Sequence, residues 1–424
     1  DSFNTAVGYF AGNAITTGLA NTLIGGLSGD AITTGGSNTF VGFNSGHVET
    51  TGANNVIIGQ AGQAQTLTND TVAVGDGALQ TNTKSAKNTA IGRSALRNLN
   101  HTSATDSNNT ALGFNAGLSV TTGIRNTLIG ALAGDALTDA DFNVAIGSHS
   151  LTADTLGSKS IAIGHSALEA QNFTSATNVF NVAIGDNAGG AVTTGTQNTL
   201  IGALAGDALT DADHNVAVGL NALTADTLGS KSTAIGTGAL GSQNFTSATD
   251  ALNTAVGYDA GVAVTTATSN NLIGALSGDA LTTGSFNQTL GVVALSADTA
   301  GNRSVAIGHG ALLTQNFTSS TDVYNIAIGH NAGLAVTTGT ENTLIGGLAG
   351  DAITDADFNV AVGKGALGTN QLGSRNTAVG TNSLHIANPA SAVNTYNTAF
   401  GYDAGYAVTT GIQNTLIGGL AGDA

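Results

Sequence analysis

The sequence predicts an all-β protein, a parallel β-solenoid of the β-roll type in which each turn of the chain stacks on the next. Three observations lead to this prediction. A short phrase ending in glycine recurs 24 times in 424 residues. The residue before that glycine is Val, Ile, Leu or Phe in every unit, and most are the β-branched residues that favour strands. A unit of about 17 residues is too small to bury its own apolar side chains and must stack on its neighbours.

The glycines that close the phrases set the period of the repeat. They are 17 residues apart almost everywhere, with one interval of 16 between Gly59 and Gly75 and one of 21 at every fourth step from Gly92 onward. Three intervals of 17 and one of 21 make a super-repeat of 72 residues, which relates Gly113, Gly185, Gly257, Gly329 and Gly401. At about 4.8 Å per coil, the coils predict a rod roughly 115 Å long. Residues 1–424 are expected to form one continuous repeat region without an internal boundary.

Both faces of the predicted strand are apolar. The position two before each glycine is Ala, Leu, Ile or Phe in every unit except at Thr289, and it faces opposite to the residue before the glycine. A strand that is apolar on both faces is covered on both sides. One cover is the solenoid interior. For the other, the mostly small alanine positions favour close approach of another copy of the chain, and a homotrimeric rod would hide that face completely. The alternative is one chain folding over itself.

Asparagine opens 20 of the 24 phrases, and the exceptions are Thr71, Ser160, Ser232 and Ser304. Stacked amides predict a hydrogen-bonded Asn ladder along the rod. Asn also tolerates the left-handed turn conformation. The alternative is a catalytic or glycan-binding column. The glycine that closes each phrase is expected to serve a tight bend or close packing.

Composition excludes several functions. The net charge is −17, from 27 acidic and 10 basic residues, which argues against nucleic acid or an anionic membrane as the partner. The sequence has no cysteine and no apolar run of about 18 residues, so we expect no thiol chemistry and no membrane span in this segment. It matches no catalytic motif, so no enzymatic activity is expected. The missing methionine and the finish within a phrase favour a segment of a longer fibre protein.

The acidic phrase GDALTDAD and its variant GDAITDAD are candidate calcium sites. Closely spaced carboxylates in a turn supply the oxygen ligands that Ca²⁺ takes. The alternative is a solvated acidic turn, which the related copy GDALTTGS favours because it keeps only Asp279. No other cofactor is expected. The candidate ligands are Asp135, Asp139, Asp141, Asp207, Asp211, Asp213, Asp351, Asp355 and Asp357.

The 21-residue step adds four residues, which must loop out from the rod. Four of these loops carry QNFTSAT or a related phrase in which Asn lies in an N-x-T sequon, and the fifth carries the divergent HIANPASA. We expect these loops to be surface contacts for a sugar or a neighbouring rod, or glycosylation sites. The alternative is that each Phe packs back onto the shaft. The candidate residues are Asn100, Asn172, Phe173, Asn244, Phe245, Asn316 and Phe317.

The phrases NTAVGYDAG, NVAIGDNAG and SVAIGHGAL resemble the head repeats of trimeric autotransporter adhesins. The longer repeat unit is similar to repeats in the shafts of bacteriophage tail fibres. The first resemblance implies a left-handed parallel β-roll in a three-chain stalked adhesin, and the second implies a fibre that often precedes a self-cleaving chaperone domain. The 17-residue coil is longer than the usual adhesin coil. The sequence contains neither an anchor nor a chaperone that would choose between the two.

These observations predict an extracellular structural fibre shaft, in a virion tail fibre or on a cell surface, that presents a binding tip to a host. A cell-surface glycan or receptor would be the partner of the tip. The alternative is a self-assembling surface or matrix filament whose rods join end to end. An ice-binding solenoid is a third interpretation because TTG recurs, but the acidic turns interrupt any flat threonine column.

Overall fold

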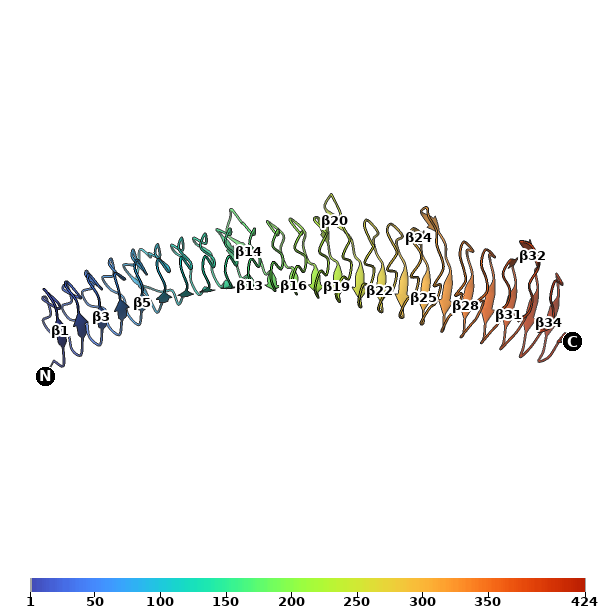
Figure 1. Ribbon diagram of the computed structural model, residues 1–424, viewed down its shortest axis with the longest axis horizontal. Helices are drawn as coiled ribbons and strands as arrows, with labels where there is room; N and C mark the ends of the chain where they lie inside the picture. Colours follow the sequence, from blue (N-terminus) through green and yellow to red (C-terminus); the bar gives the residue numbers. More distant parts are fainter. Residues whose placement is uncertain (1, 424) are drawn as a thin grey trace. The chain divides into compact units, whose positions relative to one another are not determined.

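The computed structural model describes residues 2–423, and within that range it contains strands, turns and loops but no helix. Contacts divide the chain into two compact units, one ending at Asp213 and one beginning at His214. Each unit is a parallel β-solenoid, and together they hold about 24 turns (Figure 1). The predicted all-β fold, a parallel β-solenoid, is therefore confirmed. Continuity of the solenoid between residues 213 and 214 stays a prediction.

Each turn contributes one three-residue strand to a long parallel sheet. In the first unit these strands are β1 (Thr5–Val7), β2 (Thr22–Ile24), β3 (Thr39–Val41), β4 (Val56–Ile58), β5 (Val72–Val74), β7 (Thr89–Ile91), β9 (Thr110–Leu112), β10 (Thr127–Ile129), β11 (Val144–Ile146), β13 (Ile161–Ile163), β15 (Val182–Ile184) and β16 (Thr199–Ile201). In the second they are β17 (Val216–Val218), β19 (Thr233–Ile235), β21 (Thr254–Val256), β22 (Asn271–Ile273), β23 (Gln288–Leu290), β25 (Val305–Ile307), β27 (Ile326–Ile328), β28 (Thr343–Ile345), β29 (Val360–Val362), β31 (Thr377–Val379), β33 (Thr398–Phe400) and β34 (Thr415–Ile417).

Each 21-residue step adds a separate, short two-stranded sheet. Two-residue strands pair in parallel beside each long loop, which places the loop against the preceding coil. The five pairs are β6 (Ser85–Ala86) with β8 (Thr105–Asp106), β12 (Gly157–Ser158) with β14 (Thr177–Asn178), β18 (Gly229–Ser230) with β20 (Thr249–Asp250), β24 (Gly301–Asn302) with β26 (Thr321–Asp322), and β30 (Gly373–Ser374) with β32 (Val393–Asn394).

The pairing register of the long sheet puts equivalent residues opposite each other. Thr127 pairs with Val144, Leu128 with Ala145, and Ile129 with Ile146. The middle residue of every three-residue strand from β2 to β33 is buried, whereas the first and third are half-buried or exposed. The alternation along each strand therefore directs the middle residue into the coil and the two flanking residues outward.

The predicted assignment of the two faces is wrong. We expected the small, mostly Ala position to face another copy of the chain, but it lies inside the coil, and the β-branched residue before the glycine lies outside. The reason is complementary volume within one narrow coil. Where the middle residue is Leu128, the turn carries Gly134, and a Cβ on that glycine would lie 2.8 Å from the Leu128 side chain. Where the middle residue is Ala145, the turn carries the buried Leu151.

The Asn column forms the predicted ladder, but mainly through the backbone. Oδ1 of Asn126 accepts the backbone N–H of Asn143 at 2.9 Å, and its Nδ2 donates to the carbonyl of Ala140 at 2.8 Å. Asn residues of the column between Asn21 and Asn397 are buried, which leaves them no exposed group for a glycan. We expected the Asn to take the left-handed conformation. The residue before it takes that conformation instead, as Arg125 does with φ 57°.

Candidate functional site

The acidic triplets are placed on turns, where their carboxylates connect successive coils. Oδ1 of Asp139 accepts a hydrogen bond from the Thr122 hydroxyl at 2.5 Å, and Oδ1 of Asp141 accepts the backbone N–H of Ile124 at 2.8 Å. Asp135 accepts a hydrogen bond from the hydroxyl of Thr152. The second and third triplets repeat the contacts of Asp139 and Asp141: Asp211 with Thr194, Asp213 with Thr196, Asp355 with Thr338, and Asp357 with Thr340.

The carboxylates that make these contacts therefore connect successive coils. Within residues 2–423, no three His, Cys, Asp or Glu side chains come together in a group that could hold a metal ion. In the third triplet, burial raises the pKa of Asp351, partly opposed by a backbone hydrogen bond and by His385. Calcium binding at the triplets stays a prediction, and the arrangement of the carboxylates does not add support for it.

The long loops turn their aromatic residues inward. Phe173, Phe245 and Phe317 are only 7%, 6% and 9% exposed. Their burial favours the alternative, in which each Phe packs back onto the shaft, over contact with a sugar or a neighbouring rod. The sequon residues Asn100, Asn172, Asn244 and Asn316 are exposed. Glycosylation at these positions stays a prediction.

A buried Asp–Gln clasp, which the sequence analysis missed, fixes three of the long loops. Oδ2 of Asp154 accepts a hydrogen bond from Nε2 of Gln171 at 2.6 Å, and its Oδ1 accepts the backbone N–H of Phe173 at 3.1 Å. Nε2 of Gln171 also donates to the Ser160 hydroxyl at 3.0 Å, and its Oε1 accepts from Asn181 at 2.9 Å. Burial raises the pKa of Asp154 above its ordinary value, opposed by the hydrogen bonds from Gln171 and the backbone.

The clasp covaries among the internal copies, a signal that the sequence contains. Asp226 with Ser232 and Gln243, and Asp298 with Ser304 and Gln315, repeat the same contacts. In the first and last copies all three residues change: Asn82 with Asn88 and Leu99, and Asn370 with Asn376 and Ala387. In the first copy, the Asn that replaces the Asp makes its side-chain hydrogen bonds within its own turn. Asn82 bonds to the backbone N–H and C=O of Ser85, both at 2.9 Å. Because the residues change together, the Asp and Gln work as one unit.

A surface column of cations and aromatic rings runs beside the Asn ladder. We define the cation–aromatic column as the residues that directly precede the phrase-opening positions, all of which have positive φ. Six of the ten Lys and Arg residues lie in it: Lys87, Arg125, Lys159, Lys231, Arg303 and Arg375. Several contact the rings of neighbouring coils, with Lys159 5.2 Å from the centroid of Phe180 and Arg375 4.4 Å from that of Phe358.

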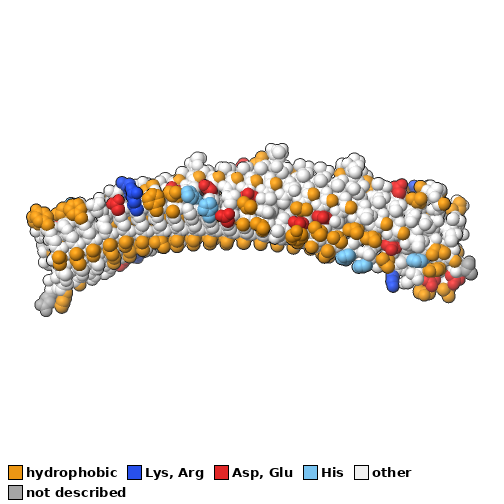
Figure 2. Space-filling model, in the orientation of Figure 1, with side chains coloured by type: hydrophobic (Ala, Val, Ile, Leu, Met, Phe, Trp, Pro, Cys, Tyr) orange, Lys and Arg blue, Asp and Glu red, His pale blue; other side chains and the backbone are white. Residues whose placement is uncertain are grey.

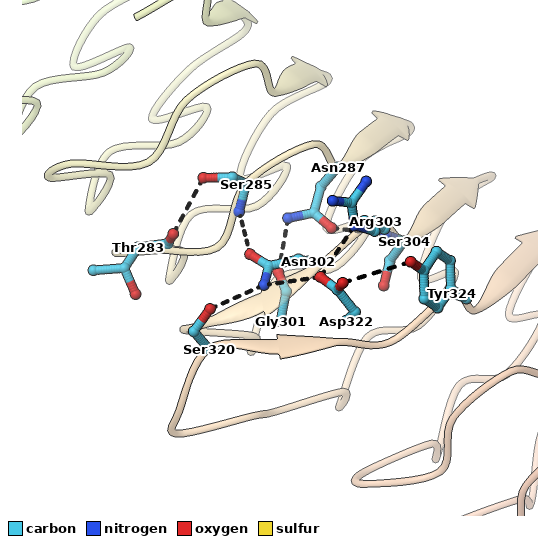
Figure 3. A network of polar contacts seen from close by, with 10 residues as sticks. All are labelled: Thr283, Ser285, Asn287, Gly301, Asn302, Arg303, Ser304, Ser320, Asp322 and Tyr324. Atoms are coloured by element: carbon cyan, nitrogen blue, oxygen red, sulfur yellow. Dashed lines mark hydrogen bonds and ion pairs between the residues drawn. The ribbon is translucent and has the colours of Figure 1, made fainter. Parts of the chain in front are cut away.

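Figure 3 shows Arg303 of this column with Asp322 and Tyr324. Its guanidinium lies 4.9 Å from the centroid of Phe286 and 5.9 Å from that of Tyr324, and Nε is 3.0 Å from Oδ1 of Asp322. Asp322 belongs to β26, the short strand that begins where the long loop returns. Nearby, the amide nitrogen of Asn302 donates to the hydroxyl of Ser320 at 3.1 Å. The cation therefore connects the loop to two coils, although exposed pairs of this kind stabilise by only about 1 kcal/mol or less.

The outward face of the sheet is uncharged, and one of its two rows is apolar throughout. We call the first and third residues of the three-residue strands the outer rows. They are Thr, Val, Ile, Leu or Phe in every strand except at Asn271 and Gln288, and none carries a charge. Ile184, Ile273 and Leu290 are 36%, 38% and 51% exposed. Figure 2 shows hydrophobic side chains in a row over the strands of each unit.

No known family model and no curated protein matches this sequence. Among residues 2–423, the structure has no helix of the length and apolarity needed to cross a membrane. Functional interpretation therefore rests on the exposed surface features of the solenoid.

Proposed function

We propose that this chain is a structural shaft of an extracellular fibre, in a virion tail fibre or on a cell surface, and that its copies associate side by side through the outer rows. The observation that carries this proposal is the outward face of the sheet, whose third-residue row is apolar and whose outer rows carry no charge. Contiguous exposed apolar surface on a soluble protein marks an interaction site. Here it repeats with every coil, so a partner that covers it must have the same repeat along its length.

Charge supports a second copy of this chain as that partner. The net charge is −17, so copies repel one another over most of their surface. The outer rows contain only uncharged side chains, and two copies can approach there without bringing like charges together. A homotrimer is the favoured closed form, because rotational symmetry lets every copy bury the same face.

The proposed role is mechanical and not enzymatic. In a shaft, the 72-residue super-repeat sets the spacing of the long loops, and a tip elsewhere in the fibre would contact a host glycan or receptor. A filament in which the rods join end to end is the alternative. It uses the same lateral face but continues to grow with concentration, whereas the shaft reaches a fixed mass.

Lysine substitutions on and off the outer rows test the proposed interface. We expect Ile184→Lys combined with Ile273→Lys to weaken association by about 100-fold or more, because two charges per chain would be buried without partners. The matched control is Gln197→Lys combined with Ser269→Lys. It adds the same charge within the cation–aromatic column, where lysine already occurs at Lys159 and Lys231.

Sedimentation velocity would measure the association, with circular dichroism to confirm that each variant keeps its β-structure. The proposal requires the outer-row variant to dissociate while the control keeps the native mass. Equal masses for both variants would show that the outer rows are not the interface.

A further inference from the structure

One polar interruption breaks the outer rows of the second unit. The first residue of the three-residue strand is Thr, Val or Ile everywhere except in the adjacent strands β22 and β23, which carry Asn271 and Gln288. The change is concentrated in one place, because β23 also has the non-β-branched Leu290 outside and the polar Thr289 inside. The hydroxyl of Thr289 lies 2.5 Å from that of Ser277, which satisfies it within the coil.

The two amides form a pair on the exposed face. Nδ2 of Asn271 donates to Oε1 of Gln288 at 2.6 Å, and both side chains are exposed. This single bond uses one donor and one acceptor, so both exposed amides keep further donors and acceptors for other hydrogen bonds. The pair borders a shallow hollow of about 330 Å³, lined also by Ile273, Leu290 and Ile307.

An interface made of identical coils does not by itself specify the axial register of two copies, and a polar pair at one position can specify it. Neighbouring coils present nearly identical outer residues, so two copies displaced by one coil would bury almost the same apolar surface. A polar pair at one position along the rod makes the aligned register differ in free energy from the displaced ones. In the aligned register both amides of one copy meet the amides of the other. After displacement by one coil, Asn271 of one copy still meets Gln288 of the other, but the remaining Gln288 lies against Val305, which offers its amide no hydrogen-bond partner, and the remaining Asn271 lies against Thr254.

We propose that Asn271 and Gln288 set the axial register in which copies of this chain associate. This inference rests on the proposed lateral association and adds to it the alignment of the copies. In this assembly, the hollow beside Asn271 and Gln288 is filled by the Asn271 and Gln288 side chains of a second copy. The uncharged outer rows allow that approach, and the amides complement themselves because each has both a donor and an acceptor.

Cysteine cross-linking tests the register, because the chain has no cysteine of its own. Ile328→Cys marks the third position of β27, and Ile345→Cys marks the equivalent position one coil further, in β28. In an aligned parallel assembly, the thiols introduced at position 328 of two copies meet each other. When the copies are displaced by one coil, a disulfide forms instead between a tagged chain carrying Ile328→Cys and an untagged chain carrying Ile345→Cys.

We expect aligned disulfides to exceed displaced ones by roughly tenfold or more with the native pair. In the background Asn271→Thr with Gln288→Val, which restores the ordinary row, the ratio should fall to within about threefold of equality. The control Thr254→Val changes a neighbouring row position without removing an amide and should keep the native ratio.

The outcomes separate the two proposals. An unchanged ratio after loss of both amides would overturn the assignment of register to this pair while leaving lateral association intact. No interchain disulfide in any mixture would contradict lateral association through the outer rows, and the register inference with it.

Discussion

Replacing Gly346 by alanine is expected to destabilise the second unit by about 3 kcal/mol or more. Gly346 has φ +132°, a conformation that residues with a Cβ rarely adopt, and a Cβ there would lie 2.7 Å from the carbonyl atoms of Gly363 in the next coil. Both the backbone conformation and the coil spacing exclude a side chain. The predicted role of the closing glycine, a bend combined with close packing, is confirmed at this position.

The neighbouring Gly347 provides the control. A Cβ at Gly347 would meet no atom within 4 Å, and we expect Gly347→Ala to change stability by no more than about 0.5 kcal/mol. Because coils in a solenoid stabilise mainly their neighbours, the effect should be local. Hydrogen exchange would therefore show lost protection in β28 and β29 for Gly346→Ala alone. Equal protection in both variants would contradict the assigned packing.

The Asp298→Asn substitution is expected to destabilise its coil by about 1–3 kcal/mol, although it preserves shape. Asp298 accepts hydrogen bonds from Nε2 of Gln315 at 2.6 Å and from the backbone N–H of Phe317 at 3.0 Å. An Asn would direct an NH₂ group at the Gln315 NH₂ group in a buried site. Rotating the Gln315 amide only moves the conflict to Asn325, which donates to Oε1 of Gln315 at 2.9 Å.

The triple variant Asp298→Asn, Ser304→Asn and Gln315→Leu should restore stability to within about 1 kcal/mol of the native chain. It converts this clasp into the combination that the chain already has at Asn82, Asn88 and Leu99. Urea denaturation of the native, single and triple variants measures the three stabilities. A triple variant no more stable than Asp298→Asn would show that the three residues do not act as a unit.

The same variants differ in their response to pH. Burial raises the pKa of Asp298 above its ordinary value of 3.8, so between these two values the folded form binds more protons than the unfolded form. The contribution of this carboxyl group is therefore most favourable below pH 3.8 and declines as pH rises through the raised pKa. Relative to the triple variant, the native chain should lose stability as pH rises through this window. A difference that stays constant with pH would contradict the raised pKa of Asp298.

The fold could be predicted from the sequence because the repeat constrains it strongly. A closing glycine at nearly constant intervals, after a β-branched residue, leaves few structures other than stacked parallel coils. The two faces of the strand could not be distinguished in this way. Alanine at the middle position is equally consistent with a close neighbour outside and a leucine inside, and only the burial of both Ala145 and Leu151 in the folded chain resolves it.

The candidate sites were harder to predict for a related reason. The phrase QNFTSAT indicates a polar surface loop, yet Phe173 is buried and Gln171 reaches the inward-facing Asp154. These residues are far apart in sequence and become neighbours only because the coils stack. The covariation of Asp, Ser and Gln among the internal copies contained this information, but the period of the repeat alone did not reveal it.

The mass of the unmodified chain in solution tests the central claim most directly. Light scattering behind size-exclusion chromatography, at about 10 μM and above, would detect any association with micromolar affinity. The proposed fibre shaft predicts a fixed mass above that of one chain, with three times 41.4 kDa as the expected value. A mass of 41.4 kDa at all concentrations would contradict lateral association and leave the outer rows exposed to water.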